Sequence, residues 1–330
     1  MFQKLTTLVL GVLLVLPVST QAATYKIATI SPDGLSWMQK LRAGVKEISA
    51  ATDDRVKFKI YPGGVQGDDE TVLRKMRIGQ LHGGAVAAGS LTRFYPDLQI
   101  YNLPLQFRSY EEVDYIRGEM DSMIADGLRE GGIETFAFTE TGFAYMFTQT
   151  PVTTIADLGE LKAWIPDNDP IAAELIKSFN VSPIPLNITD VLAGLQTGLI
   201  NAVVAPPSVA LALQWHNHVK YMTDLPLLYI YSTLAMSEKA YKRISADDKQ
   251  IVRGVMDRVF TEVGEEARAD NAKALQAIST IGIEIVEPAN LEEWQTVADE
   301  SVERLIGSGE ITPEAVRLYL DNLEQYRAGQ

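Results

Sequence analysis

The stretch ADDKQIVRGVMDRVFTEVGEEARADNAKALQAISTI, residues 246–281, decides the architecture that we expect for this chain. Ser245 stands at the N-cap position, and Asp248 follows three residues later as a shorter stand-in for the Glu of a capping box. A continuous helix over this range would be about 54 Å long, whereas helices of globular domains mostly have about 8–20 residues. We therefore expect one long helix that spans two domains. Its apolar residues recur at helical spacing: Val252, Val255, Met256, Val259, Phe260 and Val263.

Short β-rich runs alternate with helical patterns along the rest of the chain. Strands that are separated by helices argue for an α/β fold with a mostly parallel sheet. Strands are expected at 25–30, 55–61, 85–88, 133–139, 143–148, 161–165, 201–205 and 283–286. Further helices are expected at 35–51, 69–80, 109–130, 170–180, 188–197, 291–306 and 312–326.

Residues 1–22 have the pattern of a secretory signal peptide. Lys4 gives a positive start, an apolar run covers 5–18, and the small residues Thr20 and Ala22 surround a cleavage point. The run is shorter than the roughly 20 residues of a spanning helix, although an uncleaved membrane anchor is the alternative. No later stretch reaches spanning length without charges, so we expect a soluble, exported mature chain that starts near Ala23.

The composition excludes several classes of function. Lys plus Arg total 29 against 43 Asp plus Glu, a formal net charge of -14, which argues against nucleic-acid binding. The absence of cysteine excludes disulfides, thiolate metal sites and a cysteine nucleophile. His216 and His218 with Asp224 are the best metal-ligand candidates, but a surface loop is the preferred interpretation. No dinucleotide or phosphate loop is present, so we expect no cofactor and no metal.

Aromatic residues gather where strands and helices meet loops. They are Trp37, Phe143, Tyr145, Trp164 and Trp215. Each taken alone fits a hydrophobic core, but ligands of open α/β sheets bind at such junctions. Their shared placement favours a binding site.

The chain resembles the extracytoplasmic solute receptors of TRAP transporters, the periplasmic DctP type, over nearly the whole mature length. The resemblance rests on several weak motifs that occur in the family's order. They are the opening strand and turn at 25–35, Tyr61-Pro62-Gly63-Gly64, Tyr95-Pro96-Asp97-Leu98, Leu103-Pro104-Leu105-Gln106-Phe107, Ala156-Asp157-Leu158-Gly159-Glu160-Leu161-Lys162 and Ala193-Gly194-Leu195-Gln196-Thr197-Gly198.

The resemblance implies an α/β periplasmic binding protein with two lobes, a ligand cleft between them and a long helix across both. Mapped onto this sequence, lobe I takes 24–141 plus 231–270, and lobe II takes 142–230 plus 271–330. Such receptors are not enzymes. They bind a small organic solute in the periplasm and deliver it to TRAP membrane permease subunits. A periplasmic sensor or structural partner with the same fold is the alternative function, and a periplasmic enzyme is a weaker one.

The chain departs from the family pattern at three ligand contacts. Trp164 stands in place of the arginine that clamps the ligand carboxylate, Ala144 or Tyr145 replaces a second arginine, and Ala205 replaces an asparagine. We therefore expect an aromatic or apolar organic acid rather than a C4-dicarboxylate, since an unpaired buried carboxylate is costly. In the alternative, Trp164 points into the core and another arginine, such as Arg93 or Arg108, clamps the ligand. The predicted ligand-binding set is Trp37, Phe143, Tyr145, Lys162, Trp164, Ala205 and Trp215, where Lys162 shares a strand face with Trp164.

Overall fold

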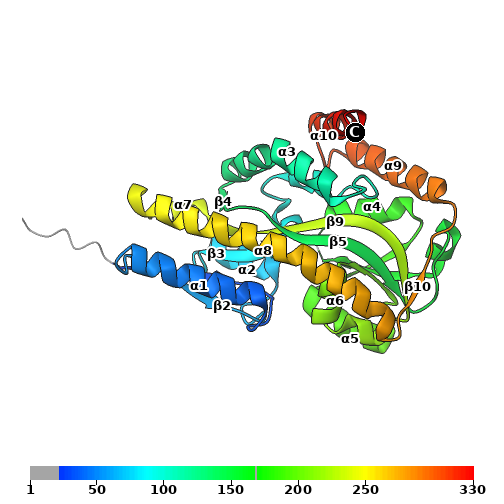
Figure 1. Cartoon of the computed structure of the whole chain (residues 1–330), viewed down its shortest axis with the longest axis horizontal. Coiled ribbons are helices and arrows are strands. Elements are labelled where there is room, and N and C mark those ends of the chain that lie inside the picture. The colour runs from blue at the N-terminus through cyan, green and yellow to red at the C-terminus, as the bar shows by residue number, and fades with distance from the viewer. Residues whose placement is uncertain (1–21, 168) are drawn as a thin grey trace, which may run out of the picture.

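The computed structural model describes residues 22–167 and 169–330, so the predicted signal peptide lies, except for Ala22, outside the described residues (Figure 1). The strands are β1 (Ala23–Ala28), β2 (Val56–Tyr61), β3 (Gly83–Ala87), β4 (Ile133–Thr135), β5 (Thr139–Thr148), β6 (Lys162–Pro166), β7 (Ser182–Leu186), β8 (Ala202–Ala205), β9 (Tyr221–Ser237) and β10 (Glu284–Val286). The α-helices are α1 (Ser36–Ala51), α2 (Asp69–Arg77), α3 (Tyr110–Glu130), α4 (Pro170–Ser178), α5 (Val191–Thr197), α6 (Pro207–Ala212), α7 (Glu238–Tyr241), α8 (Ala246–Thr280), α9 (Leu291–Ser308) and α10 (Pro313–Ala328). Short 3₁₀ turns are η1 (Ala88–Leu91), η2 (Pro96–Asn102), η3 (Ile155–Glu160), η4 (Ile188–Asp190) and η5 (Trp215–His218).

The sheet is mixed, so the expectation of a mostly parallel sheet is wrong. Its order is β2-β1-β3-β9-β5-β8-β6-β7. The outer groups are parallel, β1 with β2 and β3, and β6 with β7 and β8. At the centre, β9 runs antiparallel to β3 and β5, and β5 runs antiparallel to β8. Two βαβ-type groups are therefore joined through an antiparallel centre.

Strand β9 is the longest element that the sequence patterns did not predict; the shorter elements β7, α6 and α7 were also not predicted. Strand β9 has 17 residues, and Pro226 interrupts it within an apolar run that does not alternate with polar residues. Its ladder with β5 breaks twice, between Glu140 and Gly142 and between Ala144 and Met146 on the β5 side. Both strands run from one half of the molecule into the other (Figure 1). The irregular ladder therefore lies where the two halves meet.

The long helix α8 confirms the expectation for residues 246–281. Ser245 caps it by accepting a hydrogen bond from the Asp248 N–H at 3.1 Å. Its first half packs on α1, where Gly44 is required because a Cβ there would stand 2.8 Å from Val259 Cγ2. Further along, Asn271 accepts from the Ser208 N–H of α6 at 3.1 Å. The helix thus contacts both halves, as Figure 1 shows.

The lobe boundaries stay a prediction. The packing of the two C-terminal helices is relevant to them, because these helices contact different parts of the molecule. Helix α9 packs on α4, whereas α10 packs on α3. The segment 291–328, assigned to lobe II, therefore contacts elements of both predicted lobes. Among the described residues, none of the helices is long and apolar enough to cross a membrane.

Candidate functional site

A cavity of about 890 Å³ lies between the two parallel strand groups. Its wall includes the residues at and after the carboxyl ends of β1, β3, β6 and β8, together with the middle of α8. In open α/β sheets, ligands bind outside the carboxyl ends of the strands. The cavity therefore has the position of a ligand-binding cleft.

Four of the predicted ligand-binding residues lie on the wall of this cavity: Trp37, Trp164, Ala205 and Trp215. Trp37 belongs to the first turn of α1 and is half-buried, whereas Ala205 ends β8 and is buried. Trp294 of α9, which the patterns did not single out, also lines the cavity. All four tryptophans of the chain therefore contribute to one wall.

Trp164 contributes to the wall in a fixed orientation. Its indole N–H donates to the Leu186 carbonyl oxygen at 2.9 Å, and its ring meets Trp215 edge-on with centroids 5.3 Å apart. The single donor of the indole is thereby used within the protein. Trp164 presents ring surface to the cavity rather than a hydrogen bond.

The structure places Phe143, Tyr145 and Lys162 away from the cavity wall. The Phe143 ring is buried against Tyr110, with centroids 4.8 Å apart, and Tyr145 packs partly buried against the core. Lys162 is exposed at the amino end of β6, whereas the cavity lies at the carboxyl end of that strand. Sharing a face with Trp164 is therefore not enough to reach the cavity. As ligand contacts, all seven residues stay predictions.

The charge of the wall is strongly unbalanced. Among its described residues, Arg93 is the one cationic side chain, while Arg108, the other arginine considered for a carboxylate clamp, is not part of the wall. Arg93 is exposed and lies over the Phe94 ring at 4.9 Å. Nine acidic residues line the same cavity: Asp68, Asp69, Glu70, Glu140, Asp167, Asp169, Glu266, Asp270 and Glu310. Three of these carboxylates pair with basic side chains outside the wall, Glu140 with Arg268, Glu266 with Lys40 and Asp270 with Lys273. The remaining excess of acidic residues disfavours a ligand with several carboxylates.

Two hydrogen bonds join the predicted lobes across the cavity. The Asn187 amide, at the N-cap of η4, donates to Asp68, which itself caps α2 by accepting from the Thr71 N–H at 2.9 Å. Gln99 of η2 donates to Asp169 at 3.5 Å, and burial raises the pKa of Asp169. Because all these groups except Thr71 line the cavity, lobe-to-lobe contact and ligand access involve the same side chains.

The sequence model of the family described as "Bacterial extracellular solute-binding protein, family 7" matches residues 27–308, a span that includes most of the cavity wall. The chain belongs to this family. Its homologues are periplasmic solute-binding proteins of TRAP transporters, as the resemblance in the sequence implied.

Relatives of this family-7 protein bind chemically different solutes. It is 26% identical over 266 residues to the C4-dicarboxylate-binding periplasmic protein DctP of Rhodobacter capsulatus (77% of this chain, 79% of the relative). It is 25% identical over 244 residues to the ectoine/5-hydroxyectoine-binding protein UehA of Ruegeria pomeroyi (70% of each chain). A TRAP periplasmic solute-binding protein of Chromohalobacter salexigens with bound D-glucuronate superposes with a TM-score of 0.83 at 20% identity, covering 91% of this chain and 99% of that one. This likeness shows the two-lobed α/β fold, and the family is one of solute-binding receptors rather than enzymes.

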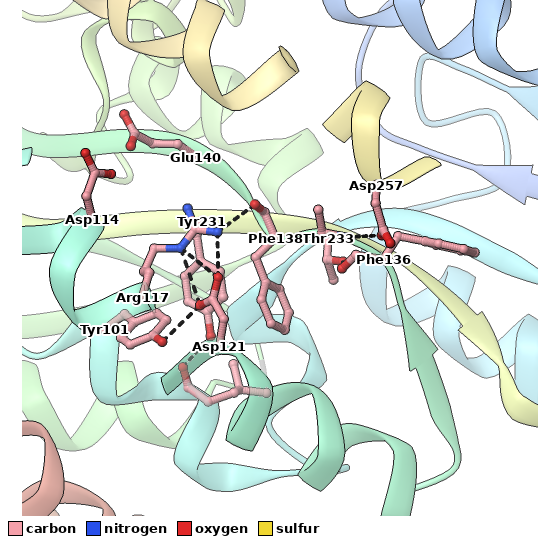
Figure 2. A network of polar contacts seen from close by, with 12 residues as sticks. Tyr101, Asp114, Arg117, Asp121, Phe136, Phe138, Glu140, Tyr231, Thr233 and Asp257 are labelled. Atoms are coloured by element: carbon pink, nitrogen blue, oxygen red, sulfur yellow. Dashed lines mark hydrogen bonds and ion pairs between the residues drawn. The ribbon is translucent and has the colours of Figure 1, made fainter. Parts of the chain in front are cut away.

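A polar network holds α3 and α8 of this family-7 protein to the central strands (Figure 2). Arg117 of α3 donates to Asp121 at 2.9 Å and to the Phe138 carbonyl at 2.7 Å. From α8, Arg268 donates to Glu140 of β5 at 2.9 Å and also pairs with Asp114 of α3. The network therefore fixes both helices at the part of β5 where its ladder with β9 is irregular.

Proposed function

We propose that this protein is the periplasmic receptor of a TRAP-type importer, which captures a small organic solute and delivers it to the membrane permease subunits. The observation that carries the proposal is the family match over residues 27–308, within which most of the cavity between the two strand groups falls. Residues 1–22 would direct export and be removed near Ala23.

We infer from the charges of the wall that a solute with a single carboxylate is favoured over one with several. Arg93 offers one guanidinium group, which is suited to a single carboxylate, whereas nine acidic residues line the same cavity. The expected preference for an aromatic or apolar acid finds no support among the relatives, because their ligands include C4-dicarboxylates, ectoine and D-glucuronate. The solute class is therefore argued from the charges of this chain.

Identification of the natural solute tests the proposal. The mature protein, isolated from the periplasm, is denatured, and the small molecules that it releases are identified by mass spectrometry and confirmed by titration calorimetry. Cells that lack the gene are expected to lose high-affinity uptake of that solute. Binding without any change in uptake would reject the transport role and favour a sensor.

A matched pair of variants tests the place of Arg93. Arg93→Gln is expected to weaken binding of a carboxylate-bearing solute at least tenfold, whereas Arg108→Gln, which changes an exposed arginine outside the wall, should leave it unchanged. Equal affinities for the two variants would exclude Arg93 as the clamp.

A further inference from the structure

The carboxylates on the cavity wall differ in whether both oxygens have partners. Asp68 and Asp169 are occupied as helix caps, and Asp270 pairs with Lys273 at 3.3 Å. Asp69 accepts from the Ala87 N–H at 2.9 Å through Oδ2, but its Oδ1 is buried and has no hydrogen-bond partner. Glu266 accepts from Lys40 through Oε1 at 3.1 Å, and its Oε2 is likewise buried without a partner.

A buried carboxylate oxygen without a donor is unfavourable, because the desolvation of the charge is not offset. The side chains of the wall do not offer Asp69 a cation, since Arg93 is the one cationic residue among those described and it is exposed. Asp68, the N-cap residue of α2, is the chain neighbour of Asp69 and brings a second carboxylate to the site. The site is therefore built with an excess of acceptors and negative charge that a bound group would have to satisfy.

The aromatic residues of the wall point to the same kind of group by a separate argument. Trp37 and Trp164 line the cavity and are partly exposed, whereas Trp215 and Trp294 line it from the core and are each 1% exposed. The negative faces of indole rings attract organic cations, and cages of aromatic residues recognise alkylated ammonium groups. A wall that combines tryptophans with carboxylates and a single arginine is suited to a cation with an apolar covering.

We propose that the solute carries a cationic nitrogen with apolar substituents, which is held by Asp69 and by the partly exposed tryptophans of the cavity wall, Trp37 and Trp164. This inference rests on the proposed function and names the solute class for the same cavity. A single carboxylate on the solute would be bound by Arg93, so zwitterions are included. Dicarboxylates and polyhydroxylated acids without a nitrogen are not.

The ionisation of Asp69 agrees with this geometry. Burial raises the pKa of Asp69 to about 7, and neighbouring Asp68 acts in the same direction, while the Ala87 N–H lowers it. A bound cation stabilises the ionised carboxylate. At neutral pH, binding is therefore expected to release about half a proton per site.

Calorimetry of the mature full-length protein with four probes tests the inference. Choline and glycine betaine carry alkylated cationic nitrogens, whereas succinate and D-glucuronate carry none. We expect binding of at least one of the first two, with proton release that is detected by comparing buffers of different ionisation enthalpy. Binding of succinate or D-glucuronate without binding of either cation would overturn the inference and leave the receptor function standing. If the protein releases no small molecule and binds none of the four probes, both proposals fail.

Two substitutions that each remove one negative charge, one on the wall and one outside it, separate direct contact with the solute from the general electrostatic potential of the protein. Asp69→Asn keeps an oxygen for the Ala87 N–H, and it is expected to weaken cation binding at least tenfold and to abolish the proton release. Glu265→Gln removes an exposed carboxylate of α8 that is not part of the wall, and it should have little effect. Equal losses of cation affinity in both variants would show that Asp69 acts only through its net charge, and would refute direct contact between Asp69 and the cation. Trp164→Leu gives a second test that does not depend on the folding of the Asp69 variant. It is expected to weaken the binding of choline more than the binding of any anion.

Discussion

Replacing Asn187 with serine is expected to shift the ligand-free protein toward more open forms. The Asn187 amide donates to Asp68 on the other predicted lobe, and its Oδ1 accepts from the Thr189 N–H at 3.2 Å within its own lobe. Serine is a good N-cap and retains the local contact, but it is too short to reach Asp68. The substitution therefore removes one lobe-to-lobe hydrogen bond and little else.

The expected change in the opening equilibrium follows from the negative charge of Asp68, which accepts the hydrogen bond from Asn187. A hydrogen bond to a charged group contributes about 1.5–3 kcal/mol. Since Asn187 and Asp68 are only partly buried, the lower end applies, and about 1.5 kcal/mol corresponds to a roughly tenfold change in the opening equilibrium. Where closed forms bind the solute, its apparent affinity falls by no more than that factor.

Distance measurements between spin labels on the two lobes provide the assay. The chain has no cysteine, so Val65→Cys and Leu199→Cys, at positions that are 68% and 49% exposed, introduce two unique labelling sites. The Asn187→Ser protein should show a larger population of long distances, and the exposed control Asn217→Ser should match the parent. Identical distance distributions for Asn187→Ser and the parent would refute the reasoning.

Three further outcomes are expected. Because burial raises the pKa of Asp69 to about 7, the folded state binds more protons than the unfolded state between about pH 4 and 7, and stability declines as the pH rises through that window. The melting temperature of Asp69→Asn minus that of the parent should therefore be larger at about pH 8 than at about pH 5. The same difference at both pH values would argue against a raised pKa of Asp69. Asp121→Ala leaves the largely buried Arg117 without its carboxylate partner and should lower the free energy of unfolding, measured in urea, by about 3 kcal/mol. Asp126→Ala removes an exposed ion pair on the same helix and should lower it by less than about 1 kcal/mol. Equal losses of stability in the two variants would argue against a buried pair. The intact mass of periplasmic protein should correspond to a chain that starts near Ala23, and recovery of residues 1–21 in a membrane fraction would contradict cleavage.

The elements that the sequence predicted well are those whose signal is local. Helix α8 is encoded by its own periodicity and cap, and three of the cavity tryptophans were found because they stand next to strand ends. Strand β9 was missed because its partners β3 and β5 supply the ladder that its own sequence, interrupted by Pro226, does not predict. The mixed sheet follows from that strand and could not be predicted without it.

The cavity-wall residues that the sequence patterns did not single out depend on contacts between distant segments. Asp69 reads as an ordinary acidic residue at a helix start, and its burial arises only where α2 meets the end of β3 at Ala87. Trp294 belongs to α9 and reaches the cavity through tertiary packing. Phe143 and Tyr145 were predicted from a strand start, but which face of β5 turns toward the cavity depends on its pairing with β9.

The two long central strands also restrict how such a receptor can change over evolutionary time. Because β5 and β9 each run through both halves, and α8 does the same, neither half is a detachable module with a linker at its border. Gene fusion or exchange of one half between related receptors would sever shared hydrogen-bond ladders instead of joining intact units. New solute preferences in this architecture are therefore expected to arise by point substitution on the inner surface, while the frame is inherited as a whole.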